Sequence, residues 1–287
     1  MTSLDLFLQR AEGLLQRLEQ IMPPRLQQPD WQTSLAWRWR KKAGSGYLQA
    51  VRHTQLHAMA QLQHVASQKE LLLQNTRQFV IGKPANNVLL TGARGTGKSS
   101  LVKACLHEFA GQGLRLIEID KADLADLPEI IELIADRPER FILFCDDLSF
   151  EVGDGAYKAL KTALDGSIAA TSENVLIYAT SNRRHLMPER FSDNQAYTVD
   201  QDGDIHPGET VEERISLSER FGLWISFRAF AQDDYLDIVD YWLRHYGCNQ
   251  PQINAARADA LRWALQRGSR SGRVAAQFAR DYAGKVL

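Results

Sequence analysis

The stretch Gly92-Ala93-Arg94-Gly95-Thr96-Gly97-Lys98-Ser99 has the spacing G-x-x-x-x-G-K-[ST], the pattern of a loop that binds phosphate. The residues before it, 87–91 (NVLLT), are apolar and β-prone, as expected of a buried strand. The residues after it, 100–110, repeat apolar side chains at helical spacing. A strand, a glycine loop and a helix therefore follow one another in the order that this motif needs. The alternative is a glycine turn that matches the pattern by chance.

The residue types of the loop fit the chemistry of a nucleoside triphosphate. Glycines let the backbone approach phosphate oxygens closely, and free N–H groups at the start of a helix bind the anion. We therefore expect residues Gly92 to Ser100 to surround the phosphates. The Lys98 ammonium would contact the β- and γ-phosphates, and the Ser99 hydroxyl would complete a Mg²⁺ shell with water and phosphate oxygens.

The composition is that of an ordinary soluble protein, with 44% apolar and 24% charged residues in a chain of 287. This length can hold one large domain or two modest ones. No apolar run approaches the roughly eighteen residues of a membrane span, and the N-terminus lacks a signal-peptide pattern, so we expect a cytoplasmic protein. Cys105, Cys145 and Cys248 lie far apart in apolar or amphipathic runs and are expected to be buried thiols rather than disulfide or zinc ligands.

Residues 1–84 are expected to form an N-terminal helical region. Residues 4–21 have an amphipathic helical pattern, and a second helix is predicted from about Leu48 to Phe79. Between them, residues 31–42 mix tryptophans with Arg and Lys. This segment could stack on bases while its cations hold phosphates, or it could lie at a membrane surface. We favour a third interpretation, in which the tryptophans anchor the N-terminal helices to the rest of the protein.

From Asn87 onward, strands and helices alternate, which predicts a doubly wound parallel sheet with helices on both faces. This α/β core is expected to span residues 85–228, and a small helical lid residues 229–287. The predicted core elements are strands at 115–119, 141–145, 175–179 and 223–227 and helices at 124–135 and 156–164. The predicted lid helices are at 234–246, 255–267 and 272–283.

A long polar loop is predicted at residues 193–213, and the wider stretch 193–219 carries eight acidic residues and one Arg. Because binding to a nucleic-acid backbone calls for positive charge, this stretch favours a protein partner with basic residues. A solvated loop without a partner is the alternative.

Polar side chains follow two of the predicted core strands. Asp146-Asp147 comes directly after the apolar run 141–145, and at the carboxyl edge of a sheet the first carboxylate can hold Mg²⁺ through water. Asp147 is then the candidate general base for an attacking water. Asn182 follows the strand at 175–179 and could orient that water with its amide. For each of these residues, the alternative is a polar turn at the end of a strand.

In this order, the pieces resemble the AAA+ class of P-loop ATPases over about residues 85–287. Gly92–Ser99 matches the Walker A motif of that class, Asp146-Asp147 matches Walker B, and Asn182 matches the sensor 1 asparagine. The resemblance implies that ATP and Mg²⁺ are the ligands, with Lys98, Ser99 and Asp146 holding them. Walker A is the most specific of these motifs, and the later pieces gain their weight from their order.

The chain resembles in particular an uncharacterised bacterial family of AAA+-like ATP-binding proteins, which share the segments Asp146-Asp147-Leu148 and Ser181-Asn182-Arg183. Many AAA+ proteins have Asp-Glu in Walker B, whereas this chain has Asp-Asp, a pair that also occurs in the initiator and helicase-loader branches. Because Asp reaches less far than Glu, the resemblance implies ATP binding but leaves the rate of hydrolysis open.

Two arginine segments complete the resemblance. Residues 218–222 (SERFG) resemble the box VII segment, in which the arginine, here Arg220, acts as a finger toward a neighbour's nucleotide and so implies a homo-oligomer. A surface salt bridge is the alternative for Arg220. Residues 270–273 (RSGR) resemble the sensor 2 motif at the start of the last helix, and the alignment favours Arg273 over Arg270. An arginine there opposes the helix dipole, which functional placement or solvent exposure would explain.

Three functions are compatible with these motifs. The first is an ATP-hydrolysing, oligomeric AAA+-type protein that remodels or loads a protein or protein–nucleic-acid assembly, with Lys98, Asp147, Asn182 and Arg220 as catalytic residues. The second is a switch or scaffold that binds ATP tightly and hydrolyses it little. A P-loop kinase is the third and least favoured, because no acceptor site is evident in the sequence. We expect a protein client, whereas contact with nucleic acid is left open.

Overall fold

The computed structural model of the chain describes residues 12–13, 29–32, 34–42, 44–52, 54, 58–151, 154–165, 172–183, 186, 197–199, 205–207, 217 and 219–287. The helix predicted at 4–21 lies outside these residues except at positions 12–13, and so does most of the acidic stretch 193–219. Within that stretch, β7 (Tyr197–Val199) and β8 (Ile205–Pro207) form an antiparallel pair.

A seven-stranded sheet forms the centre of the protein, in the order β2-β1-β4-β5-β6-β3-β9. Neighbouring strands are parallel except for β2 and β1, which pair antiparallel at one edge. The parallel sheet predicted from residue 87 onward is therefore confirmed, with its strands β3, β4, β5, β6 and β9. The strands are β1 (Ala36–Lys42), β2 (Ser45–Ala50), β3 (Val88–Gly92), β4 (Leu114–Glu118), β5 (Arg140–Cys145), β6 (Val175–Ser181) and β9 (Leu223–Phe227).

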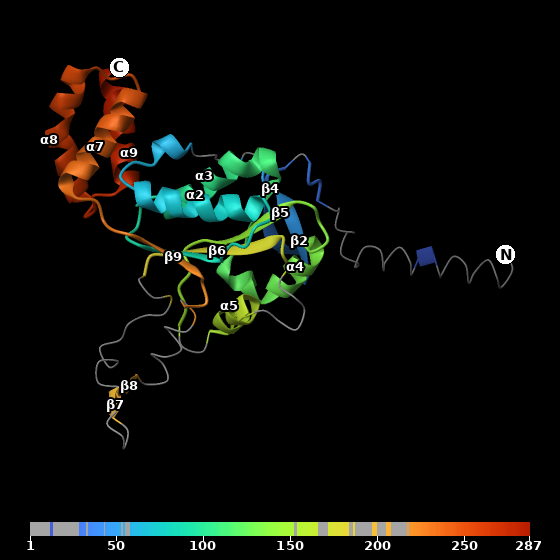
Figure 1. Ribbon diagram of the computed structural model, residues 1–287. Helices are drawn as coiled ribbons and strands as arrows, with labels where there is room; N and C mark the ends of the chain where they lie inside the picture. The colour runs from blue at the N-terminus through green and yellow to red at the C-terminus, as the bar shows by residue number, and fades with distance from the viewer. Residues whose placement is uncertain are drawn as a thin grey trace, which may run out of the picture.

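Helices cover both faces of the sheet, as Figure 1 shows. The central strand β5 is apolar because alternate side chains enter opposite cores: Leu143 packs with α4 and α5 on one face, and Phe144 with α2 and α3 on the other. The predicted doubly wound α/β core is thus confirmed. Its helices and 3₁₀ turns are η1 (Met59–Gln61), α2 (Ala66–Val80), α3 (Lys98–Phe109), η2 (Ala110–Gln112), η3 (Lys121–Asp126), α4 (Leu127–Ile134) and α5 (Gly155–Asp165).

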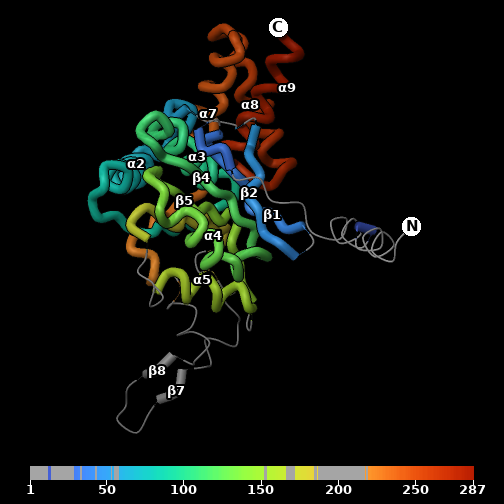
Figure 2. The backbone as a smooth tube through the Cα atoms, turned by 90° about the vertical axis from the view of Figure 1, so that its right-hand side faces the viewer, coloured from blue at the N-terminus to red at the C-terminus, as the bar shows by residue number. Residues whose placement is uncertain are grey.

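A helical lid follows the last strand and lies beyond one end of the core (Figures 1 and 2). Its helices enclose a core of their own, in which small side chains such as Ala256 and Ala279 allow close packing. The second helix begins with a capping box: the Asn249 side chain accepts from the backbone N–H of Gln252 (3.0 Å), and the Gln252 side chain accepts from the Asn249 N–H (2.9 Å). The lid helices are α7 (Gln232–His245), α8 (Gln250–Gln266) and α9 (Gly272–Val286), which confirms the three predicted helices.

The prediction of a long helix at 48–79 is wrong over its first half. Residues 36–50 form the β1–β2 hairpin, which turns at Gly44 (φ +83°), and α2 begins only at Ala66. The first strand of this hairpin, β1, has the sequence period of two that is typical of a strand: Trp37 and Trp39 are 0% and 1% exposed, whereas the intervening Arg38 faces solvent and pairs with Glu118. The division into 1–84, 85–228 and 229–287 stays a prediction, although this hairpin extends the sheet.

The tryptophans of residues 31–42 are buried side chains of the sheet's edge. The Trp31 ring lies 4.6 Å from that of Trp37 and 5.2 Å from that of Phe141, measured between centroids. The Trp39 indole N–H donates to the Asp126 carboxylate at 2.8 Å. These rings therefore anchor a β-hairpin rather than a pair of helices, and their burial leaves no free face for stacking on bases.

Two further sequence expectations concern the cysteines and the membrane. Cys105, Cys145 and Cys248 are buried free thiols, and burial raises the pKa of Cys105 and of Cys145 to about 12. Among the residues that the structure describes, no helix is both long and apolar enough to cross a lipid bilayer.

Candidate nucleotide-binding site

Three loops meet at the carboxyl edge of the sheet because of the strand order. β6 lies between β5 and β3, with Ala179 opposite Cys145 and Thr180 opposite Leu90. Asp146-Asp147 follows β5, Asn182 follows β6, and the glycine loop follows β3. Residues far apart in the sequence are thereby brought to one place, as the sequence predicted.

The glycine loop has a backbone that side chains would prevent. Gly92 has φ +128°, and a Cβ there would lie 1.9 Å from the carbonyl oxygen of Phe227 on β9. Gly95 has φ +72°, and a Cβ there would lie 2.8 Å from the Ser271 hydroxyl of the lid. The loop is thus held between β9 and the start of α9, and the Thr96 hydroxyl braces it internally by donating to the Ala93 carbonyl at 2.8 Å.

Lys98 is buried at the first position of α3, with 6% of its surface exposed. Its ammonium donates to the carbonyl oxygens of Gly92 and Ala93, each at 2.8 Å, and to Asn182 Oδ1 at 3.0 Å. Burial lowers the pKa of Lys98 to about 8; the nearby Asp147 and Asp146 oppose this shift, and Arg273 and Arg94 add to it. The lysine is therefore a cation at neutral pH whose present acceptors are neutral oxygens, so an anion would be a better partner.

Asp146 joins the loop after β5 to the start of α3. Its Oδ1 accepts from the Ser99 hydroxyl at 2.6 Å and from the Thr180 hydroxyl at 2.5 Å. Carboxylate, hydroxyl and water oxygens are the ligands that Mg²⁺ takes beside phosphate. The residues present thus fit a Mg²⁺ site in which Ser99 and Asp146 supply the protein ligands.

Asp147 lies in the left-handed region, with φ +53°, which is uncommon for a residue other than glycine. Its backbone N–H donates to the Thr180 hydroxyl at 2.9 Å, and its carboxylate accepts a hydrogen bond from the Asn182 amide. Asn182 therefore bridges Lys98 and Asp147, because its oxygen accepts from one and its nitrogen donates to the other. The two residues predicted to act on an attacking water lie in direct contact.

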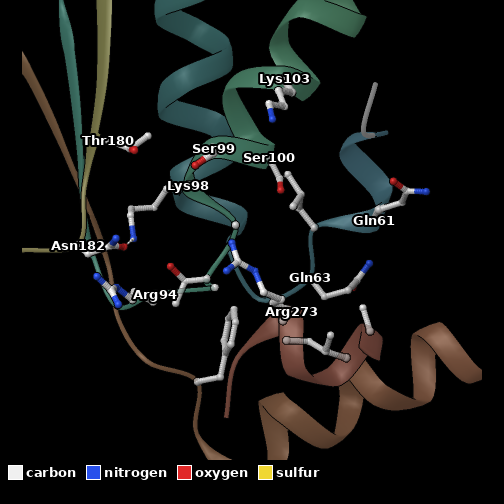
Figure 3. A pocket seen from close by; sticks show the side chains of 18 of the residues that line it. Gln61, Gln63, Arg94, Lys98, Ser99, Ser100, Lys103, Thr180, Asn182 and Arg273 are labelled. Carbon is white, nitrogen blue, oxygen red and sulfur yellow. Dashed lines mark hydrogen bonds between the residues drawn. The ribbon is translucent and has the colours of Figure 1, made fainter. Parts of the chain in front are cut away.

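A cavity of about 650 Å³ opens between the core and the lid and contains these residues (Figure 3). Of the sequence-predicted site residues, Arg94 through Ser100, Asp146, Asp147, Asn182 and Arg273 line it. Gly92 and Ala93 contribute through the carbonyls that hold Lys98. The phosphate loop, both carboxylates and Asn182 are thus brought together as predicted.

The two arginine predictions differ in outcome. Arg273 lines the cavity from the first turn of α9, its N–H donates to the Gly95 carbonyl at 3.4 Å, and Figure 3 shows its side chain extending from the lid into the cavity. Arg270 is not among the lining residues. Arg220 lies just before β9, so it is at the amino edge of the sheet, whereas the cavity is at the carboxyl edge. There it pairs with Asp165. The structure therefore does not bring Arg220 to the cavity of its own chain, and its role stays a prediction.

Several residues of the site were missed by the sequence reasoning. Thr180 holds both Asp146 and Asp147 in place, and a hydroxyl at the end of an apolar strand was the signal that could have found it. The other missed residues of the cavity carry no motif, and most of them have apolar or amide side chains. They come from α3, from the turn at η1 and from the lid: Lys103, Gln61, Leu62, Gln63, Phe230, Ile238, Trp242, Gly272 and Ala276.

The chemistry of the cavity suits a polyphosphate rather than a metal held by protein side chains. Arg94, Lys98, Lys103 and Arg273 line it together with the two carboxylates. Among the described residues, no group of three or more His, Cys, Asp or Glu side chains is arranged to hold a metal ion. A divalent cation here would therefore need oxygens from a ligand and from water to complete its shell.

The fold resembles that of solved structures of low sequence identity. Two variants of Thermotoga maritima RuvB match with a TM-score of 0.51 and 14% identity, over 78% of this chain and 63% of the RuvB chain. The protein thus spans less than two thirds of the RuvB chain that it matches. A weaker likeness, with a TM-score of 0.47 and 12% identity, is to a chain of the Escherichia coli MS115-1 HORMA:CdnC:Trip13 complex, over 78% of this chain and 90% of that one.

A comparison of sequence gives the family. A search of curated proteins finds no match. The family model described as "protein of unknown function (DUF815)" matches residues 32–286, which is most of the chain and includes every cavity residue described above. The chain therefore belongs to the DUF815 family, and its fold is of the AAA+ type.

Proposed function

We propose that this protein binds Mg-ATP in the cavity between core and lid and hydrolyses it. One observation carries the proposal: Lys98, the Ser99–Asp146 pair and the Asn182–Asp147 pair meet at one cavity, which the lid closes with Arg273. Its volume of about 650 Å³ lies within the range of small-molecule sites. The same arrangement explains why four cations line a cavity with two carboxylates.

Binding would use the charged and the aromatic side chains of the cavity differently. The phosphates would lie on the glycine loop, and the Lys98 ammonium would exchange the carbonyls of Gly92 and Ala93 for phosphate oxygens. Mg²⁺ would be held by Ser99 and Asp146 and would neutralise phosphate charge. The aromatic side chains of the lining, Phe230 and Trp242, suit the flat face of a base.

Hydrolysis would use Asp147 and Asn182. A water molecule attacks the γ-phosphorus, its proton passes to the Asp147 carboxylate, and the bond to the β–γ bridging oxygen breaks to leave ADP. Asn182 now donates to that carboxylate, so it must turn its amide toward the water for Asp147 to act. Arg273 would stabilise charge on the transferred phosphate from the lid of the same chain.

The larger role that we propose is that of an oligomeric AAA+-type ATPase that remodels or loads a protein or protein–nucleic-acid assembly. Arg220 does not line the cavity of its own chain. Its position before β9 would instead let it reach the cavity of a neighbouring subunit, which supports an oligomer. For this role it would have to leave Asp165. The acidic stretch 193–219 suits a basic protein client.

A switch that binds ATP and hydrolyses it slowly is the second candidate. The hydrogen bond from Asn182 to Asp147 favours it, because this bond engages one oxygen, Oδ1, of the carboxylate that should accept a proton from water and so weakens it as a base. The short Asp side chain at this position favours it as well.

ATP turnover measured against protein concentration tests the proposal, with mass followed by light scattering. We expect turnover per subunit that rises with assembly, is absent in Lys98→Ala and falls in Arg220→Ala. Tight ATP binding with negligible turnover at every concentration would instead establish the switch. Turnover by a strict monomer would remove the role of Arg220 in a neighbour's site, and the absence of nucleotide binding would overturn both candidates.

A further inference from the structure

His64 connects the nucleotide cavity to the lid. It lies between η1 and α2, directly after the three residues of that turn that line the cavity. Its Nδ1 is 3.1 Å from Asp234 Oδ1, and its Nε2 is 3.3 Å from Asp237 Oδ2, both on the first turns of α7. We call these three residues the His64 bridge.

The geometry of the bridge favours the charged form of the imidazole. A neutral imidazole carries one N–H, so one of its nitrogens would present a lone pair to a carboxylate oxygen. The imidazolium carries an N–H on both nitrogens and can donate to both carboxylates. Contacts on both nitrogens at 3.1 and 3.3 Å therefore fit a positively charged His64.

The backbone conformation of His64 is unusual for a residue other than glycine. Its φ is +58°, in the left-handed region, which is unfavourable for a residue with a side chain. Such conformations persist where surrounding contacts hold them. In the part of the chain that the structure describes, His64 and Asp147 are the two non-glycine residues with positive φ, and the second lies in the phosphate site itself.

The same turn also touches the phosphate loop. Leu62 Cδ2 lies 3.2 Å from the position that a Cβ on Gly97 would take, so this side chain packs against the loop beside Lys98. On the opposite side of the cavity, the Arg273 N–H meets the Gly95 carbonyl. The lid is thus joined to the phosphate loop directly through the Arg273 backbone and indirectly through His64, and the second connection is made by ionisable side chains.

We propose that His64 is a positioning residue: as an imidazolium bound to Asp234 and Asp237, it holds the lid over the cavity and so raises the affinity for nucleotide. This inference rests on the proposed binding of nucleotide. Loss of the proton would turn one attractive contact into a repulsive one and loosen the lid. Because all three side chains are partly exposed, the effect should be modest.

Three substitutions separate charge from backbone effects. His64→Asn removes the charge and suits a left-handed backbone, and His64→Lys restores a cation that persists at neutral pH. Asp237→Asn removes the charge of one of the two carboxylates. It leaves Asp234 unchanged, whose Oδ2 caps α7 by accepting from the Ala231 N–H at 3.2 Å. None of these variants alters a residue of the phosphate site.

The measurement is the dissociation constant of ADP by calorimetry at about pH 6 and about pH 8. We expect wild type to lose affinity about two- to fivefold more than His64→Asn over this range, as an exposed ion pair would give. His64→Lys should bind as wild type does at about pH 6 and keep that affinity at about pH 8. Asp237→Asn keeps the contact with Asp234, so its pH dependence should lie between those of wild type and His64→Asn. Equal pH dependence in wild type and His64→Asn overturns the proposal.

A second readout does not need nucleotide binding. At about pH 6, without nucleotide, amide hydrogen exchange at residues 235–237, the first of α7 whose N–H groups have intrahelical acceptors, should be faster in His64→Asn than in wild type and His64→Lys, because the start of α7 loses its contact with the core. If wild type binds no ADP at any pH, the proposed function fails, and this exchange experiment still decides the His64 bridge. Equal exchange in the three proteins contradicts it.

Discussion

The core half and the lid half of the cavity are built differently. On the core side, Lys98, Asp146 and Asp147 are fixed by hydrogen bonds between the ends of adjacent buried strands. On the lid side, the helices have a separate core and meet the loop through Arg273 and the His64 bridge. The difference teaches that the rigid half is suited to chemistry, which needs fixed geometry, and the lid half to controlling affinity.

The largest effect should come from the core half, on nucleotide binding. Lys98→Ala removes a buried cation that would contact two phosphates, so we expect ADP and ATP to bind about a hundredfold more weakly. Lys69→Ala is the matched control because Lys69 also lies in the first turns of a core helix, α2, but does not line the cavity. Its affinity should change by less than about threefold. Similar losses in the two variants, measured by calorimetry, would contradict the assignment of the phosphate position.

The core half was predictable because its residues carry local signals. Buried parallel strands are apolar throughout, as in 141–145, and the polar residues at their ends mark the carboxyl edge. The lid half was predictable as three helices but not as a binding surface, since Phe230 and Trp242 meet Leu62 only in the folded protein. The β1–β2 hairpin was missed for a related reason, because β1 pairs with β4 some eighty residues later, as the Arg38–Glu118 contact shows.

The second prediction separates chemistry from binding within the core half. Asp147→Asn keeps the shape of the side chain but removes the base, so turnover should fall about a hundredfold or more while ADP affinity stays near that of wild type. Asp120→Asn is the matched control, because Asp120 follows the neighbouring strand β4 and pairs with Arg40 outside the cavity. A phosphate-release assay at saturating ATP gives the comparison. Undiminished turnover in Asp147→Asn would remove this residue from the chemical step.

The third prediction concerns the lid half. Trp242→Ala removes an aromatic side chain from the lining of the cavity, so KM for ATP should rise about tenfold with kcat within about twofold of wild type. Trp263→Leu controls for loss of lid stability, because Trp263 packs within the lid and does not line the cavity. If Trp242→Ala lowered kcat and left KM unchanged, the lid would take part in chemistry, and the contrast between the two halves would fail.

The smallest effect is the pH dependence that Lys98 gives to binding, and it can be separated from that of the His64 bridge. Burial lowers the pKa of Lys98 to about 8 in the free protein, and bound phosphate would raise it, because an opposite charge favours the ammonium. Above about pH 8, binding therefore takes up a proton, and affinity falls as pH rises. We expect ADP to bind about threefold more weakly at about pH 8.5 than at about pH 7.5.

Measuring this in the His64→Asn background removes the imidazole from the titration. Lys98→Arg is the control, because a guanidinium stays charged over the whole range and should flatten the dependence. If the dependence survived in Lys98→Arg, another group would titrate on binding. If it were absent from the His64→Asn protein, the phosphates would lie too far from Lys98 to change its pKa. In the expected case, the dependence above about pH 8 reports on the core half of the cavity alone, because the imidazole of the lid half has been removed.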